Sequence, residues 1–333
     1  MSCSHYSSMS KVLKMKASAT AHPIQGLIKY HGLKDEELRI PFHDSISVAT
    51  APTVSHTTIE FGKFNKDTAS IDGRDLTGRE LGRVLSVVNE VRRRSGVEAK
   101  VRMVSRNNFQ SNVGLGASAS GFAALALSSC KAAGLRLTLE EVSAIARRGA
   151  GSASRSVTGA FSRWKAGHED EESYSYQIAS EAFQMGIVVA LIPAFKYTEN
   201  AHKAVLGSPF FHSRLAYVHG ALAEMENAIR KRDIERIGAL AERDSLILHG
   251  ITMTGLDEMI LWRPETVKVI LEARKMRSEG LPAYFSIDTG ATVYVNTKPK
   301  HVREVEDRIK QLGIETIVCG VAGHAKLTKK HLF

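Results

Sequence analysis

The sequence predicts a protein that mixes short β-strands with longer α-helices, and three observations support this. Short runs rich in β-branched residues, such as 46–49 and 57–61, recur in the first 72 residues and are typical of strands. Apolar residues then follow helical spacing over 81–91, behind Thr77 and Glu80, which have the pattern of a capping box. In the second half, long helical stretches alternate with short strand-like runs.

The other elements follow from the same rules. The small-residue run 122–127 predicts a buried helix that begins near Ser118, and a second capping box at Thr138 and Glu141 begins a helix that ends near Gly149. Pro264 is expected in the first turn of its helix. The remaining predicted helices are 212–231, 233–249, 264–279 and 301–312, and the remaining predicted strands are 101–105, 186–192, 284–287, 292–296 and 316–318.

The length of 333 residues fits one large or two modest domains. We expect a flexible N-terminus over 1–14, one domain over 15–183 and a second over 184–333, because the character of the chain changes near residues 180–186. The longest uncharged apolar stretch, 185–195, is too short to cross a bilayer, and the first residues lack the apolar core of a secretory signal. A cytoplasmic location is therefore expected.

The formal net charge of +10 indicates an anionic partner. Because the basic residues are scattered and no nucleic-acid-binding signature is present, small phosphorylated substrates are favoured and nucleic acid is the alternative. The three cysteines, Cys3, Cys130 and Cys319, are far apart and show no metal-ligand spacing, so no metal site is predicted.

A glycine-serine loop over 113–121 is the first candidate site, with Gly114, Gly116, Ser118 and Ser120 as its phosphate-binding residues. Glycine lets a backbone approach an anion closely, and a helix that begins there directs N–H groups at a phosphate. The loop is not a Walker motif, because no Gly-Lys-Ser/Thr follows. The alternative is that the small residues serve close helix packing.

Three charged residues complete the candidate chemistry. Arg155 follows a glycine-serine segment and has the fork geometry that grips a carboxylate or phosphate; the alternative is a surface arginine near a helix cap. Asp288 ends a strand before Thr-Gly, where a turn residue is the alternative. Lys29 ends an apolar run before Tyr30, where a lysine that snorkels from a strand is the alternative.

Together these segments resemble, in order and spacing, the mevalonate diphosphate decarboxylase family of the GHMP kinase superfamily. The resemblance covers roughly residues 16–327 and rests on four stretches: LIKYHGLKDEELRIPFHDSISV, NNFQSNVGLGASASGFAALAL, ARRGAGSASRS and SIDTGATVYV. The segments around the first of these resemble an archaeal branch that acts on other mevalonate phosphates. The resemblance implies an α+β GHMP-kinase fold, with a ribosomal-S5-like N-terminal half, a ferredoxin-like C-terminal half and the site in the cleft between them.

The resemblance also implies roles for single residues. Asp288 matches the catalytic aspartate near the C3 oxygen, Lys29 the lysine that pairs with it, and Arg155 the arginine that holds the substrate carboxylate. Further matches are a phosphate-loop serine and contacts to the substrate or its phosphate: Ser118, Gly151, Ser152 and Tyr30. His202 and Lys203 lie where the diphosphate enzymes carry serine and methionine, and are candidates for an extra phosphate; a solvated loop is the alternative.

Two departures from the family decide the expected substrate. Leu33 replaces a lysine that meets the terminal phosphates of the diphosphate substrate, and Ala117 replaces a loop serine that serves nucleotide phosphate and metal. We therefore expect an ATP-independent decarboxylase that converts mevalonate 3,5-bisphosphate into isopentenyl phosphate, phosphate and carbon dioxide without a cofactor.

Two alternatives stay open. The first is a decarboxylase of mevalonate 5-phosphate, or of the 5-diphosphate, that depends on ATP and Mg²⁺. The second is a non-catalytic, nucleic-acid-binding member of the family. For either enzyme the family resemblance implies a homodimer.

Overall fold

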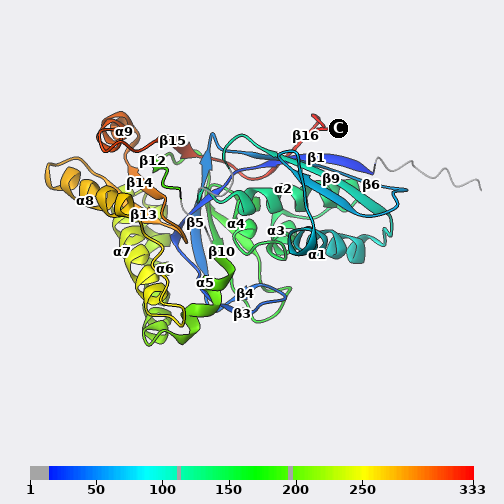
Figure 1. Ribbon diagram of the computed structural model, residues 1–333, viewed down its shortest axis with the longest axis horizontal. Helices are drawn as coiled ribbons and strands as arrows, with labels where there is room; N and C mark the ends of the chain where they lie inside the picture. Colours follow the sequence, from blue (N-terminus) through cyan, green and yellow to red (C-terminus); the bar gives the residue numbers. More distant parts are fainter. Residues whose placement is uncertain (1–14, 111–113, 194–197) are drawn as a thin grey trace, which may run out of the picture.

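The computed structural model describes residues 15–110, 114–193 and 198–333 (Figure 1). Two large β-sheets, a two-stranded sheet and the helices packed on them form this part of the chain. The predicted flexible segment 1–14 lies outside the described residues, as does Val113 at the start of the glycine-serine loop. No helix in these ranges is long and apolar enough to span a membrane.

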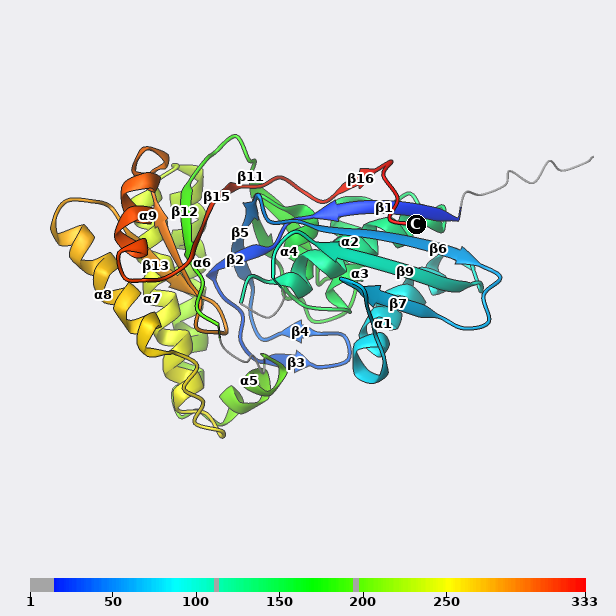
Figure 2. The same cartoon turned by 45° about the horizontal axis from the view of Figure 1, so that its top comes forward.

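The first sheet belongs mainly to the N-terminal half, and the strand nearest the C-terminus closes one of its edges (Figure 2). Its order is β16 (Lys326–Thr328), β1 (Lys16–Ala21), β6 (Ser55–Gly62), β9 (Lys100–Asn107), β7 (Thr68–Ile71) and β8 (Arg74–Asp75). The neighbours pair antiparallel except β7 and β9, which are parallel. Strand β16 near the C-terminus therefore lies beside β1, the first described strand.

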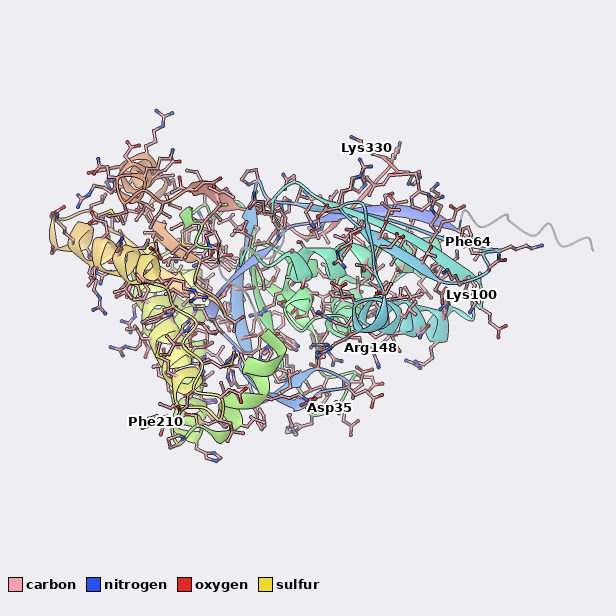
Figure 3. The ribbon with its side chains drawn as sticks, viewed as in Figure 1. Asp35, Phe64, Lys100, Arg148, Phe210 and Lys330 are labelled. Atoms are coloured by element: carbon pink, nitrogen blue, oxygen red, sulfur yellow. The ribbon has the colours of Figure 1, made fainter. Side chains whose placement is uncertain are left out.

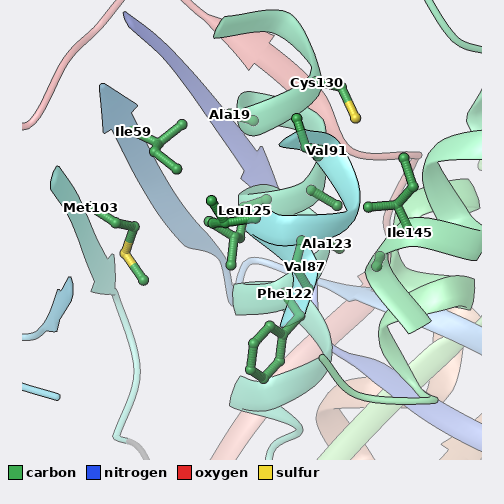
Figure 4. Close-up of a cluster of buried hydrophobic side chains, with 14 of the residues drawn as sticks. Ala19, Ile59, Val87, Val91, Met103, Phe122, Ala123, Leu125, Cys130 and Ile145 are labelled. Atoms are coloured by element: carbon green, nitrogen blue, oxygen red, sulfur yellow. The ribbon is translucent and has the colours of Figure 1, made fainter. Parts of the chain in front are cut away.

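Helix α2 (Ala117–Ala132) lies on this sheet, and α1 (Gly78–Ser95) packs beside it against α2 and β7. Helices α3 (Leu139–Arg147) and α4 (Ala153–Thr158) pack on α2 and reach β11 of the second sheet. Helix α2 lies in the middle and is buried on nearly all sides, because its small residues let the sheet and the other helices approach closely. Figure 4 shows this core, in which Phe122 and Leu125 of α2 pack with Ile59 and Met103 of the sheet and Val87 of α1.

The second sheet joins both halves of the chain. Its order is β11 (Ser175–Ala179), β10 (Phe161–Trp164), β5 (Ser45–Ala51), β15 (Thr316–Val321), β12 (Gly186–Ala190), β14 (Val293–Thr297) and β13 (Tyr284–Ile287), and β2 (Ile24–Ile28) also pairs with β5. The junction is the antiparallel pair β5–β15, in which Ala51 lies opposite Gly320. A division of the chain at residue 184 thus separates sequence segments but does not separate the sheets.

Helices cover both faces of the C-terminal part of this sheet (Figure 1). Side chains of β12 alternate: Ile187 and Val189 pack towards α6 (Phe211–Arg230) and α7 (Ile234–Met253), whereas Val188 packs towards α8 (Pro264–Ser278) and α9 (Val302–Lys310). A small hairpin, β3 (Leu33–Asp35) with β4 (Ile40–Pro41), and α5 (Thr198–Ala204) lie near one another at the lower edge in Figure 2. Two short 3-10 helices, Val205–Gly207 and Pro299–His301, complete the described elements.

Most predicted elements are confirmed within two or three residues, including the capping box at Thr138 and Glu141. The prediction of a capping box at Thr77 and Glu80 is wrong. Thr77 does precede α1, but its side chain makes no capping hydrogen bond. Glu80 instead forms a two-point ion pair with Arg74, at 2.7 and 2.8 Å, because the β8 strand brings that guanidinium to the start of the helix.

Gly159, which caps α4, has φ 62° and ψ −169°, a conformation that essentially only glycine adopts. A Cβ atom at this position would lie 2.2 Å from the backbone oxygen of Gly323. The close approach locks the segment before β16 against the end of α4.

Gly159→Ala is therefore expected to lower the free energy of unfolding by several kcal/mol, because both backbone strain and a backbone clash are added. Gly96→Ala is the matched control: it also has a positive φ of 72°, but nothing lies within 4 Å of its Cβ position. The control should lose only about 1 kcal/mol. Equal losses for the two variants in urea unfolding would contradict this account.

Candidate active site

A cavity of about 460 Å³ lies where the two halves of the chain meet. Its walls come from β2 and the residues after it, α1, the start of α2, the α3–α4 turn, and the residues after β13. Ten of the predicted site residues line it: Lys29, Tyr30, Gly114, Gly116, Ser118, Gly151, Ser152, Arg155, His202 and Asp288. The fold thus brings together residues that are more than 250 positions apart.

Two predicted site residues do not line the cavity. Ser120 is buried, and its hydroxyl lies 2.6 Å from that of Ser55 on β6, so it joins α2 to the sheet. Lys203 has a side chain that is 64% exposed and pairs with Glu36 at 2.8 Å. For Lys203, the alternative of a solvated surface residue therefore describes the structure, whereas His202 beside it faces the cavity.

Asp288 is half-buried at the end of β13, and its carboxylate is held by a backbone group. The Gly26 N–H donates to Asp288 Oδ1 at 3.0 Å. A Cβ atom at position 26 would lie 2.9 Å from that oxygen and 2.6 Å from Lys29 Cγ, so only glycine lets the strand approach both side chains. This contact fixes the carboxylate at the cavity wall.

Lys29 is buried, with only 4% of its surface exposed, and does not snorkel to solvent. Its ammonium donates to the hydroxyl oxygens of Ser245 and Ser286, both at 3.0 Å, and lies 3.7 Å from Asp244 Oδ2. Burial lowers the pKa of Lys29, while the negative charges of Asp244 and Asp288 oppose that shift. The negative charge of Asp288 thus favours the charged form of Lys29. A direct ion pair between Lys29 and Asp288 stays a prediction.

A second buried ion pair, between Arg214 and Asp244, holds Lys29 in place. Asp244 on α7 accepts a hydrogen bond from the Lys29 N–H at 3.0 Å and from Arg214 Nη2 at 3.0 Å. Arg214 on α6 also donates to the Lys29 carbonyl at 2.7 Å. Both side chains are fully buried, so the end of β2 is clamped between two helices.

Arg155 is a buried cation in the lining of the same cavity. It is 3% exposed, and its Nε and Nη1 atoms have no hydrogen-bond partner among the described residues. Its guanidinium lies 5.5 Å from the Tyr30 ring centre and 5.9 Å from that of Trp164. Burial lowers its pKa to about 10, so it stays charged near neutral pH. A buried, incompletely satisfied cation facing a cavity fits a carboxylate or phosphate ligand and excludes the surface-arginine interpretation.

Gly151 and Tyr30 shape the space around this arginine. A Cβ atom at position 151 would lie 2.8 Å from Trp164 and 2.9 Å from the Tyr30 hydroxyl oxygen. The same hydroxyl forms a hydrogen bond with the Ser152 backbone, and burial raises the pKa of Tyr30. The ring of His202 stacks on Tyr30 with centres 5.0 Å apart. These contacts hold a neutral hydroxyl beside a fixed cation.

The described part of the glycine-serine loop leads into α2, as predicted. Gly114 and Gly116 have φ values of 84° and 75°, and Gly116 precedes the first helical residue, Ala117. Ser118 is exposed in the first turn and lines the cavity. The first N–H groups of a helix have no partner within it, so this end of α2 suits a phosphate group. Residues 114–118 would hold such a group.

Three arginines at the cavity were not predicted: Arg39 after β3, and Arg79 and Arg83 on α1. Burial lowers the pKa of Arg39, and lowers that of Arg83 to about 10. Arg79 and Arg83 recur at helical spacing, which is a signal that the sequence does carry. Arg39 has no such signal, because its place depends on the fold of the hairpin.

The residues that hold Lys29 were also missed. In α7, Asp244, Ser245, His249 and Thr252 recur on one helical face that is otherwise apolar. Polar residues on a core-facing stripe indicate a buried network, so this signal was available. Within the described residues, no group of three or more His, Cys, Asp or Glu side chains is placed to hold a metal ion.

Comparisons with known proteins agree with this geometry. Residues 21–175 match the family described as diphosphomevalonate decarboxylase-like N-terminal domain. The phosphomevalonate decarboxylase of Haloferax volcanii is 46% identical over 316 residues, which cover 94% of this chain and 98% of that protein. The structure of mevalonate diphosphate decarboxylase from Staphylococcus aureus is similar, with a TM-score of 0.89, 28% identity, and coverage of 94% and 98%.

A third comparison concerns nucleotide. A structure of the mevalonate diphosphate decarboxylase from Enterococcus faecalis, described as showing a mevalonate diphosphate mediated ATP binding mechanism, is also similar. The TM-score is 0.89 and the identity 28%, and the match covers 95% of this chain and 99% of that one. The fold is thus that of the GHMP kinase superfamily, as predicted. The chain belongs to the family of the phosphomevalonate and diphosphomevalonate decarboxylases.

His249 gives the site a testable response to acid. It is 1% exposed, and its Nε2–H donates to the Asp288 carbonyl at 2.9 Å. Burial lowers its pKa to about 4, from an ordinary value of 6.5. Below pH 6.5 the unfolded chain therefore binds a proton that the folded chain does not, and stability is lost as the pH falls towards 4.

We expect this histidine to account for about 2 kcal/mol of the unfolding free energy lost between pH 7 and pH 5. His249→Gln, which keeps an N–H donor but does not titrate, should lose correspondingly less over that range. The exposed His219 offers the control, since His219→Gln should follow the wild-type curve. Urea unfolding at several pH values measures this, and parallel curves for all three proteins would contradict it.

Proposed function

We propose that the chain decarboxylates a phosphorylated mevalonate in this cavity. The observation that carries the proposal is Arg155, a buried guanidinium in the same cavity as the Asp288 carboxylate and the Lys29 ammonium. Its Nε and Nη1 atoms have no hydrogen-bond partner among the residues that the structure describes. A substrate carboxylate would supply the acceptors that Arg155 lacks, and its fork would orient that group without protonating it. The family membership supports the same chemistry.

The residue types suit each stage of such a reaction. When a phosphate on the C3 oxygen leaves with the electron pair of the C3–O bond, C3 gains positive charge. The electrons of the bond to the carboxylate then form the C=C bond, and carbon dioxide departs. Asp288 would stabilise the positive centre, because it is a fixed anion held by Gly26. Lys29, buried nearby, would favour the departing phosphate electrostatically.

Mevalonate 5-phosphate is the substrate that we propose, with ATP supplying the phosphoryl group for the 3-hydroxyl. The name of the Haloferax relative supports this choice, and so does the phosphate-accepting start of α2 with Ser118 at the cavity. Leu33, in place of a lysine, argues against a 5-diphosphate. Basic groups gathered inside a cavity also fit a small anion better than nucleic acid.

A second candidate is the ATP-independent decarboxylation of mevalonate 3,5-bisphosphate, which the sequence analysis favoured. One observation supports it: the first residue of α2 is Ala117, so the helix start lacks one hydroxyl for a nucleotide phosphate. The homodimer and the cytoplasmic location remain predictions from the resemblance and the sequence.

A nucleotide-omission assay separates the two candidates. With mevalonate 5-phosphate, carbon dioxide release is expected to need ATP and to produce one ADP per carbon dioxide. With mevalonate 3,5-bisphosphate and no nucleotide, the second candidate predicts that carbon dioxide is released. The first candidate makes no such prediction for this substrate. No release from any mevalonate phosphate, with or without ATP, would overturn the proposed function.

Asp288→Asn should reduce turnover by at least about a hundredfold, because the fixed anion beside the developing positive charge is lost. An amide oxygen can still accept from Gly26, so the variant is expected to unfold at the wild-type urea concentration. Asp75→Asn, at an exposed position on β8, is the control and should keep full activity. A variant at position 288 with near-normal turnover would remove Asp288 from the mechanism.

A further inference from the structure

We propose that Arg39 and Arg83 together bind the phosphate at C5 of the substrate, and that Arg39 is a specificity-determining residue of this site. The inference rests on the proposed function, because it assigns the other end of the same ligand. None of the family contacts expected from the sequence involves either residue.

The two guanidiniums are anchored on neighbouring backbone carbonyls. Arg39 Nε donates to the Arg148 carbonyl at 3.2 Å, and Arg83 donates to the Gly149 carbonyl from Nε at 3.0 Å and from Nη2 at 2.8 Å. These carbonyls belong to the end of α3, whose position Arg148 marks in Figure 3. The side chains come from different elements, the β3–β4 hairpin and α1, yet both line the cavity.

Two like charges so close together need an explanation. The negative end of the α3 dipole favours cations at this place. Burial and the charges of Arg39 and Arg79 lower the pKa of Arg83, and Tyr30 and Glu80, which also line the cavity, only partly oppose that shift. A fork-shaped donor pair from two arginines matches the oxygen geometry of a phosphate. A bound phosphate dianion would offset the repulsion that the protein builds into this wall.

The cavity lining carries Arg155 as well as the pair Arg39 and Arg83, so it offers cations to a ligand with two anionic groups. The positive charges of Arg155, Arg39 and Arg83 each act to lower the pKa of Tyr30, and all four residues line the cavity. A mevalonate phosphate carries a carboxylate at C1 and a phosphate at C5. Arg155 would hold the first group, and Arg39 with Arg83 the second.

Arg39 has a left-handed backbone conformation in the turn between β3 and β4. Its φ is 55°, which is uncommon for a residue other than glycine and is often found at functional sites. It also lies on the hairpin that carries Leu33, where the family resemblance places a phosphate-binding lysine. The hairpin therefore still supplies one cation to the cavity. This cation is the guanidinium of Arg39, next to β4, instead of a lysine at position 33 on β3.

The test is equilibrium binding of mevalonate 5-phosphate, unphosphorylated mevalonate and ATP to the full chain by titration calorimetry. Arg39→Leu is expected to weaken binding of mevalonate 5-phosphate by at least about tenfold, because a charge-assisted hydrogen bond is lost. Binding of mevalonate and of ATP should change less than about twofold if only the C5 phosphate contacts Arg39. Arg39→Lys, which keeps the charge but not the fork, should fall between.

Lys34→Leu is the matched control, since it removes the same charge from the same hairpin at an exposed residue outside the cavity. It should bind all three ligands as the wild type does. Equal affinity of the Arg39→Leu and Lys34→Leu proteins for mevalonate 5-phosphate would overturn the proposal, and so would a loss confined to ATP.

Measuring both binding and turnover separates a failure of this phosphate site from a failure of the proposed function. Wild-type turnover combined with unchanged binding by Arg39→Leu would reject the phosphate site alone. Selective loss of mevalonate 5-phosphate binding in a chain that releases no carbon dioxide would support the phosphate site and reject the decarboxylase.

Discussion

The buried contact between Lys29 and Asp244 is the interaction on which the rest of the site depends. Asp244 accepts from the Lys29 backbone and lies 3.7 Å from its ammonium, while Arg214 holds the other carboxylate oxygen. Removing one partner of such a buried pair leaves an uncompensated charge, at a cost of about 3–5 kcal/mol. Because β2 belongs to the shared sheet and Asp244 to α7, the same contact joins the sheet to the helices of the second half.

The contact between Lys29 and Asp244 also determines where the charged groups of the cavity lie. Lys29 directly follows β2, so fixing it also fixes Gly26 and, through the Gly26 N–H, the Asp288 carboxylate. In the same cavity, Arg155 is held among Tyr30, Trp164 and the close approach at Gly151. The cavity thus presents a fixed anion, a fixed ammonium and a fixed guanidinium without water having to reorganise around them, which is the condition for electrostatic catalysis.

Sequence patterns located the local elements well but could not place the halves relative to one another. Strand 284–287 was predicted to the residue, because a β-type run between two turns is a local signal. The pairing of β5 with β15 was out of reach, since it joins residues more than 260 positions apart and no local pattern sets its register. The motif comparison found Lys29, Arg155 and Asp288, whereas Arg39 and Arg214 contact the site only through the tertiary fold. Lys203 follows a site residue in sequence, but a helix turns it outward.

The central claim is that Arg155 orients a carboxylate that leaves as carbon dioxide. The most direct measurement is the release of label from mevalonate 5-phosphate carrying carbon-13 at C1, in the presence of ATP, by the wild type and by Arg155→Gln. The account predicts one labelled carbon dioxide per alkene formed by the wild type, and release slowed by at least about a hundredfold in a folded variant. Release by Arg155→Gln at the wild-type rate would contradict it.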